Sequence, residues 1–140
     1  MPLIYRAMLR DGEKPQIGSE GKMLGVRTPP HRHADVKPDE ESMVEPGRGM
    51  SVAPHWRDLP YFLIPRRLQH LVPKAKGINN AYCWRMGDGS FEDAVMTEEL
   101  ALRVDSKTHE VVEPTKQMQI DAFQAALAAT KDDWEIDEEG

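Results

Sequence analysis

GRGMSVAP, residues 47–54, is the stretch on which the predicted fold depends. Pro46-Gly47 marks a turn, and the apolar run that follows is typical of a short strand. IYRAM near the start of the chain and HEVVEPTKQM near its end are two further β-like runs. Each of the three carries one polar side chain, namely Arg6, Ser51 and Glu113. The three runs predict a β-rich core with polar groups on three of its strands.

The remaining pattern predicts short strands with frequent interruptions. Pro60 and Pro65 exclude a regular helix from Trp56–Leu71 and leave short helical turns there. Thr28–Asp39 combines prolines, histidines and charges without periodicity, which indicates a long loop. The other expected β elements are Leu3–Leu9 followed by an Asp11-Gly12 turn, the short apolar run Met23–Val26, Met50–Ala53, Ala81–Met86, and a hairpin of Leu100–Val104 with Val111–Glu113.

The clearest helix is predicted over Met118–Lys131. Apolar residues recur there at helical spacing along one face, at Met118, Ala122, Phe123, Ala126 and Leu127. With the strands, this predicts a single α+β domain over residues 1–131, with a split, bent, mostly antiparallel β core, short flanking helices and one C-terminal helix. Residues 132–140 are rich in acids and are expected to form a solvated, frayed tail.

Composition limits the classes of protein that fit. The chain has 140 residues, of which 39% are hydrophobic and 30% charged, which is typical of a soluble globular protein. Residues 1–8 lack the apolar run of a signal peptide, and no stretch has membrane-spanning length, so we expect a cytoplasmic protein without a membrane partner. Cys83 is the only cysteine, which excludes an intrachain disulfide. The net charge of −6 disfavours a nucleic-acid partner.

Several runs together resemble a known family. They are LGVRTPP, MVEPGRGMSVAP, LPYFLIPRR, and HEVVEPTKQM followed by DAFQAALAATKDDW. They are similar to small bacterial proteins related to the type VI secretion exported effector two toxin. IYRAM is similar to that family's opening strand, GMS to its Gly-Thr-Ser segment, and HEVVEPTKQM to its His-x-x-x-x-Pro-x-x-x-Met segment. The chain differs at Met50, where the family has threonine, and at Glu113, where it has an apolar residue.

The resemblance implies an ADP-ribosyltransferase-like fold, NAD as substrate, an intracellular macromolecular target and a cognate immunity or antitoxin protein. Cleavage of the nicotinamide bond passes through an oxocarbenium-like sugar, so a nearby carboxylate is favourable, and Glu113 is the candidate. Arg6, with Arg27 as its rival, suits a diphosphate. Ser51 is expected to bind a ribose hydroxyl, while Trp56, Tyr61 or Phe62 are placed by sequence to stack on nicotinamide.

Simpler explanations exist for each candidate. Glu113 is equally well explained as a strand-end acid facing water, Arg6 as half of a structural ion pair, and Ser51 as ordinary turn chemistry. Phe62 is expected in the core because Leu63 and Ile64 follow it. Cys83, between Tyr82 and Trp84, is expected to be a small buried residue.

Two alternative functions remain open at the level of sequence. One is a ribonuclease-like toxin in which His109 or His55 acts as general acid or base beside Arg6. The other is a non-enzymatic module whose acidic surface docks a partner. No metal is expected, because the spacings of the histidines match no zinc signature; they are His31, His33, His55 and His109. A basic cluster is most simply a solvated face and comprises Arg66, Arg67, Lys74 and Lys76.

Overall fold

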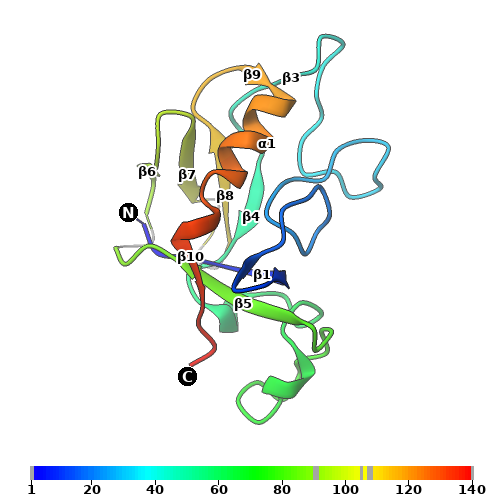
Figure 1. The fold of residues 1–140 in the computed structure, drawn as a ribbon, viewed down its shortest axis with the longest axis vertical. Coiled ribbons are helices and arrows are strands. Elements are labelled where there is room, and N and C mark those ends of the chain that lie inside the picture. The colour runs from blue at the N-terminus through cyan, green and yellow to red at the C-terminus, as the bar shows by residue number, and fades with distance from the viewer. Residues whose placement is uncertain (1, 90–91, 105, 107–108, 140) are drawn as a thin grey trace.

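A computed structural model describes residues 2–89, 92–104, 106 and 109–139. Its strands pair antiparallel in three sheets (Figure 1). The first sheet has the order β10-β5-β1-β2 and contains β1 (Ile4–Asp11), β2 (Lys14–Pro15), β5 (Ala81–Met86) and β10 (Trp134–Ile136). The second has the order β4-β8-β7-β6 and contains β4 (Met50–Val52), β6 (Ala94–Val95), β7 (Leu100–Val104) and β8 (Glu110–Pro114). The third pairs β3 (Met43–Val44) with β9 (Met118–Gln119).

Strand β1 separates two hydrophobic clusters because its side chains alternate between its two faces. Ile4 and Met8 belong to the larger cluster, which also contains the buried face of the C-terminal helix. Tyr5 and Ala7 belong to the smaller cluster under the segment that follows β4. Two backbone hydrogen bonds between Tyr5 and Ala53, of 2.8 and 2.9 Å, join β1 to the chain just after β4. The first two sheets therefore meet at β1, where the polar residue Arg6 lies.

The predicted C-terminal helix is confirmed, but it is shorter at both ends. Helix α1 spans Ile120–Ala128, since Met118–Gln119 instead pairs with β3 as β9. Phe123 and Leu127 are buried as expected, whereas Ala122 is exposed. After the helix, the chain enters a 3-10 turn, η3 (Lys131–Asp133).

The expectation of a frayed tail is wrong for residues 134–139. Trp134 and Ile136 pair with Met86 and Trp84 as β10, and Trp134 is 1% exposed. The neighbouring acids are also engaged, in ion pairs between Glu135 and Arg85, Asp137 and Arg85, and Glu138 and Arg67. The buried ring of Trp134, together with strand pairing to β5, fixes this segment, which a purely acidic tail lacks.

Most of the other predicted elements are confirmed. Ala81–Met86 is a strand, β7 and β8 form the predicted hairpin, and Trp56–Leu71 contains only the 3-10 turns η1 (Trp56–Asp58) and η2 (Arg66–Leu68). The Thr28–Asp39 segment has neither helix nor strand. Met23–Val26 is buried at Leu24 and Val26 but forms no named strand. The protein is thus an α+β domain of mostly antiparallel strands with one C-terminal helix.

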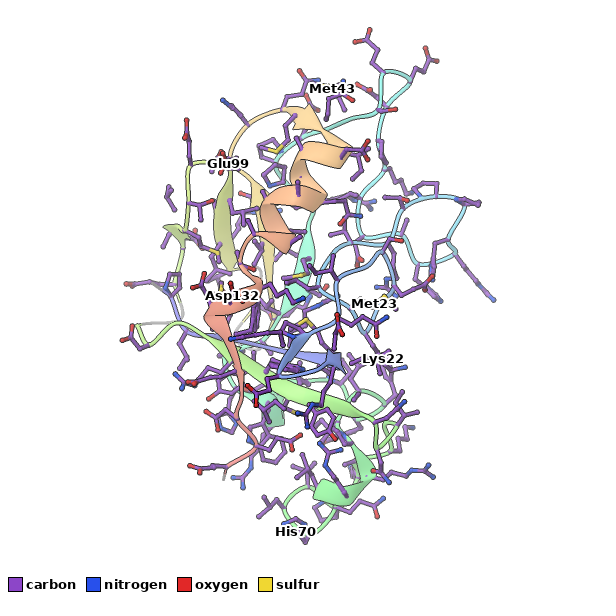
Figure 2. All side chains as sticks on the ribbon, viewed as in Figure 1. Lys22, Met23, Met43, His70, Glu99 and Asp132 are labelled. Atoms are coloured by element: carbon purple, nitrogen blue, oxygen red, sulfur yellow. The ribbon has the colours of Figure 1, made fainter. Side chains whose placement is uncertain are left out.

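Residues 59–80 form a lobe at the bottom of the view, beyond β5, with His70 at its far end (Figures 1 and 2). Phe62 lies in this 59–80 lobe with 60% of its surface exposed, so its predicted place in the core is wrong. Ile64 is fully buried in this irregular segment, whereas Phe62 faces outward. Cys83 in β5 is fully buried, as predicted.

No helix in the part of the chain that the structure describes has the length and hydrophobicity needed to cross a bilayer.

Candidate functional site

A cleft of about 560 Å³ opens between β1, β4, the loop that follows β2 and the 59–80 lobe. This volume lies within the range of about 300–1,000 Å³ typical of small-molecule sites. The cleft is lined by Arg6, Ala7, Leu9, Glu20, Gly21, Lys22, Met23, Arg27, His31, Ser51, Val52, Ala53, Asp58, Leu59, Pro60, Phe62, Leu63, Ile78 and His109. Its lining therefore combines cations, two acids and two histidines with an apolar wall from the lobe.

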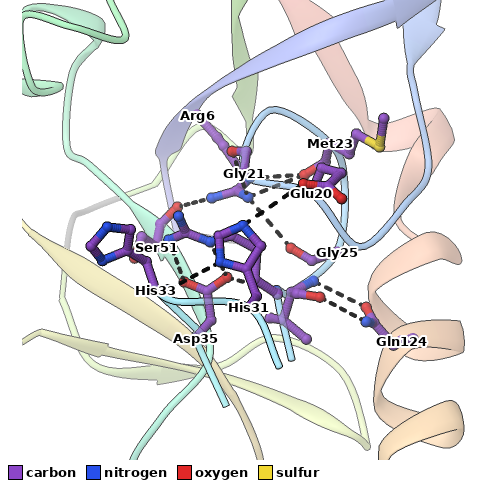
Figure 3. A network of polar contacts seen from close by, with 12 residues as sticks. Arg6, Glu20, Gly21, Met23, Gly25, His31, His33, Asp35, Ser51 and Gln124 are labelled. Atoms are coloured by element: carbon purple, nitrogen blue, oxygen red, sulfur yellow. Dashed lines mark hydrogen bonds and ion pairs between the residues drawn. The ribbon is translucent and has the colours of Figure 1, made fainter. Parts of the chain in front are cut away.

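Arg6 reaches the cleft from β1 but directs its hydrogen bonds to main-chain carbonyls (Figure 3). Its Nε donates to the Met23 carbonyl over 3.2 Å, and Nη1 donates to the Ser51 carbonyl over 2.7 Å. Nη2 lies 3.1, 3.2 and 3.4 Å from the carbonyl oxygens of Met23, Gly21 and Gly25. The side chain thus ties the loop after β2 to strand β4 and shapes the cleft wall.

Burial is the main electrostatic influence on this guanidinium. Arg6 is 6% exposed, and the loss of hydration lowers the pKa of Arg6 to about 10. Asp35 acts in the opposite direction, while the neighbouring charge of Arg27 adds to the lowering. The four main-chain carbonyls that accept from Arg6 therefore offset part of the cost of burying its charge, which bonds to no carboxylate among the residues that the structure describes.

Arg27 is the more accessible cation, with 27% of its side chain exposed. Its Nε and Nη2 donate to the two carboxylate oxygens of Asp35 over 3.1 and 3.0 Å, and its backbone N–H donates to the same side chain over 2.8 Å. These hydrogen bonds raise the pKa of Arg27 above its ordinary value. Nη1 takes part in none of these contacts, so a bidentate anchor holds the guanidinium while one edge remains available.

Helix α1 fixes the residue immediately before Arg27. Gln124 accepts a hydrogen bond from the Val26 N–H over 3.0 Å and donates to the Val26 carbonyl over 2.9 Å (Figure 3). A Cβ at Gly25 would lie 2.0 Å from the Gly18 carbonyl oxygen, and φ at Gly25 is +154°, so only glycine fits this crossing of the loop. The position of Arg27 thus depends on contacts from both sides.

Ser51 lies on the cleft, on the face of β4 opposite the buried residues Met50 and Val52. Its strand can approach β8 closely because Gly49 has no side chain: a Cβ there would lie 1.9 Å from the Val112 carbonyl oxygen. The glycine of the GRGMS run therefore has a packing role, and the serine that follows is brought next to the loop residues that Arg6 binds.

Glu113 does not line the cleft. It shares a sheet face with Ser51, because Ser51 pairs with Val111 two residues before it. Its Oε2 accepts a 2.7 Å hydrogen bond from the Gly47 N–H and lies 3.1 Å from Nε of Arg103. These contacts fasten the turn before β4 to the β7–β8 hairpin, and the catalytic role of Glu113 stays a prediction.

Of the three aromatic candidates, Phe62 lines the cleft, whereas Trp56 and Tyr61 lie outside its lining. Trp56 is fully buried in the smaller hydrophobic cluster, and its Nε1 donates to the Glu139 carbonyl over 2.8 Å. Tyr61 is 46% exposed on the 59–80 lobe, with Lys74 Nζ 5.7 Å from its ring centroid. Neither ring is therefore placed to stack on a ligand in the cleft, and the apolar wall there comes from Leu59, Phe62, Leu63 and Ile78.

Two histidines reach the cleft. Nδ1 of His31 accepts a hydrogen bond from the His33 N–H over 3.0 Å, and Nε2 lies 3.9 Å from Oε2 of Glu20. His109 lines the cleft just before β8. His55 does not: its ring packs against Tyr5 with centroids 5.1 Å apart. Within the described residues, no group of histidines, cysteines or acids is arranged to hold a metal ion.

Sequence reasoning missed Glu20 and Asp58 as cleft acids and His31 as a cleft histidine. Glu20 lies in an irregular loop and Asp58 in a 3-10 turn, so no periodicity distinguishes them. The Gly-Ser-Glu-Gly composition of residues 18–21 is the one local sign that this loop passes close to other backbone.

Comparison with known proteins adds no relative from which a role can be transferred: no protein-family model matches the chain, and no curated protein matches it significantly.

Proposed function

We propose that this chain is an NAD-dependent, ADP-ribosyltransferase-like bacterial toxin that modifies an intracellular macromolecule. The proposal includes the fold of that family, action in the cytoplasm of the producing or target cell, and neutralisation by a cognate immunity or antitoxin protein. The observation that carries it is that one cleft is lined by Arg6, Arg27 and Ser51, three of the residues expected to bind NAD. They come from β1, the following loop and β4, which are well separated in the sequence.

The geometry divides the two arginines between different tasks. Arg27 offers a partly exposed guanidinium for the diphosphate, held in place by Asp35. Arg6 acts as a positioning residue, because its donors are directed to the loop and to Ser51. The hydroxyl of Ser51 is assigned to a ribose hydroxyl, and the apolar wall of the lobe, including Phe62, is assigned to the nicotinamide ring.

A carboxylate that stabilises the sugar cation has to face the bound nucleotide. Glu20 and Asp58 line the cleft and Glu113 does not. We therefore expect Glu20→Gln or Asp58→Asn to reduce nicotinamide release more than Glu113→Gln does. The three carboxamide variants, assayed side by side at equal concentration, assign this role.

The test of the proposal is incubation of the purified chain with labelled NAD and a bacterial lysate. We expect label on a macromolecule or release of free nicotinamide. Arg27→Met removes a charge-assisted contact worth about 1.5–3 kcal/mol, which corresponds to about a tenfold to hundredfold loss of NAD affinity. Arg10→Met, on the exposed end of β1, is the matched control. A folded sample that shows no transfer, no nicotinamide release and no NAD binding by calorimetry contradicts the proposal.

One observation favours ribonuclease activity as a second candidate function: His31 and His109 line the same cleft as Arg6 and Arg27. Two histidines beside cations suit acid–base cleavage of a phosphodiester. This alternative requires that RNA is cut without NAD, that His109→Ala stops the cleavage, and that His55→Ala, outside the cleft, does not.

A further inference from the structure

The 59–80 lobe differs in charge from the rest of the molecule. Its 22 residues contain four Lys and Arg residues and no Asp or Glu. Because the whole chain carries −6, the residues outside the lobe carry a net charge of −10. A cationic projection on an otherwise acidic protein attracts anionic groups locally while the rest of the surface repels them.

The lobe also concentrates exposed apolar side chains. Tyr61, Phe62, Leu71 and Ile78 are 46%, 60%, 39% and 40% exposed, and they make up more than half of the large hydrophobic residues exposed in the described part of the chain. Single exposed hydrophobic residues are common, but several on one small projection are typical of an interaction surface.

Backbone hydrogen bonds hold the lobe together and fix the positions of these exposed side chains. The two legs of the lobe pair through hydrogen bonds from Lys76 N–H to the Tyr61 carbonyl, from Gly77 N–H to the Ile64 carbonyl and from Arg66 N–H to the Gly77 carbonyl, at 2.9, 2.7 and 3.2 Å. A Cβ at Gly77 would lie 2.8 Å from the Ile64 carbonyl oxygen, so the close approach requires glycine. This pairing sets Tyr61 and Phe62 beside Lys76 and Ile78.

The outer cations of the lobe are not paired with acids in the described part of the chain, although Lys74 Nζ lies 5.7 Å from the centroid of the Tyr61 ring. Arg66, Lys74 and Lys76 are exposed, and none of them forms an ion pair with any described residue. Arg67, by contrast, already binds an acidic segment of this chain: its Nη2 donates to Glu138 over 2.6 Å. The segment that leads to Glu138 begins with the extended strand β10, and residues 134–137 alternate apolar residues with acids. The lobe therefore holds one acidic, extended segment at its base while the outer cations remain open.

We propose that Tyr61, Phe62, Ile78, Arg66, Lys74 and Lys76, here called the lobe surface, dock an extended acidic segment of a partner protein that carries apolar side chains. Charge complementarity supplies the attraction, and the exposed rings and Ile78 supply apolar contact. A protein fits better than single-stranded RNA, because the exposed Leu71 and Ile78 are aliphatic and do not stack on bases, and because Arg67 of the same lobe already binds a carboxylate. Phe62 and Ile78 also line the cleft, so a docked segment lies at its mouth.

The proposal is tested by fluorescence anisotropy with the full chain and a labelled synthetic peptide in which glutamate and leucine alternate. Binding should weaken as salt is raised. Lys74→Glu with Lys76→Glu should weaken it by about tenfold, as expected for two reversed contacts at an interface. Lys37→Glu with Lys116→Glu makes the same change in net charge at exposed sites outside the lobe and should change it less than about twofold. Phe62→Ser should weaken binding of the alternating Glu-Leu peptide. It should not weaken binding of a Glu-Ser peptide, which has no apolar side chain to contact Phe62.

Three results overturn the proposal. The first is no binding of the Glu-Leu peptide by the folded chain. The second is an equal loss of peptide affinity in the lobe double variant and in the control double variant, which means that only overall charge matters. The third is binding of oligouridylate RNA that depends on Lys74 and Lys76 and exceeds binding of the peptide. None of these measurements uses NAD, so the result is independent of the proposed transferase activity.

Discussion

Arg6→Met separates a structural arginine from one that binds substrate. The wild-type guanidinium donates to the carbonyls of Gly21, Met23, Gly25 and Ser51. Methionine fills much of the same space but donates nothing, so these four carbonyls lose their partner. Each buried group left unsatisfied costs about 1–3 kcal/mol, although water in the adjacent cleft reaches some of them.

A second effect acts in the opposite direction. Burial lowers the pKa of Arg6 from 12.5 to about 10, which corresponds to roughly 3 kcal/mol of unfavourable burial that methionine avoids. Because two to four orphaned carbonyls outweigh this relief, we expect a net loss of about 2–5 kcal/mol. For a chain of this size the thermal midpoint then falls by about 10 °C.

The assay is thermal and urea unfolding of wild type, Arg6→Met and Arg27→Met. Arg27→Met removes the guanidinium from Asp35, which is only 7% exposed, so this variant should also lose stability, and each midpoint is compared with that of wild type. Nicotinamide release is then measured well below all three midpoints. An Arg6→Met protein with an unchanged midpoint and no NAD binding refutes the structural assignment, because the hydrogen bonds to the four carbonyls would then contribute nothing to folding.

Three further predictions concern other parts of the fold. Glu113→Gln should lower the free energy of unfolding by at most about 1 kcal/mol, since a glutamine still accepts from the Gly47 N–H and a partly exposed ion pair is weak. Loss of growth inhibition with an unchanged thermal midpoint would instead show that Glu113 takes part in the chemistry. Phe123→Ala should destabilise the fold by about 3–5 kcal/mol in urea titrations, because the ring is fully buried, and an unchanged midpoint would mean that α1 is not docked on the sheets. Burial raises the pKa of Cys83 to about 12, and burial with the hydrogen bond to Asp137 raises the pKa of Tyr5 to about 12. As the pH rises, the unfolded chain therefore loses these protons first, and the free energy of unfolding falls from about pH 9 toward pH 12. Cys83→Ala and Tyr5→Phe should each show a shallower fall than wild type. Profiles identical to that of wild type would contradict the two pKa shifts.

Local patterns in the sequence were sufficient to predict several of the strands and the C-terminal helix. The aromatic run Ala81–Met86 before Gly87, the hairpin of Leu100–Val104 with the strand before Pro114, and the spacing of Phe123 and Leu127 each indicate a strand or helix without reference to a partner. Prolines at positions 60 and 65 were likewise sufficient to exclude a long helix between β4 and β5.

Tertiary structure alone decided where those elements end and what their polar residues do. Met118–Gln119 continues the helical pattern but pairs with Met43–Val44, and the acidic C-terminal segment becomes β10 because β5 offers it an edge. Arg6 is predictable as a polar residue on a strand, yet its partners are carbonyls of a loop that no local pattern places there. The cleft exists only because that loop, β4 and the lobe meet, since hydrogen bonds and burial between distant segments depend on the folded chain and not on neighbouring residues.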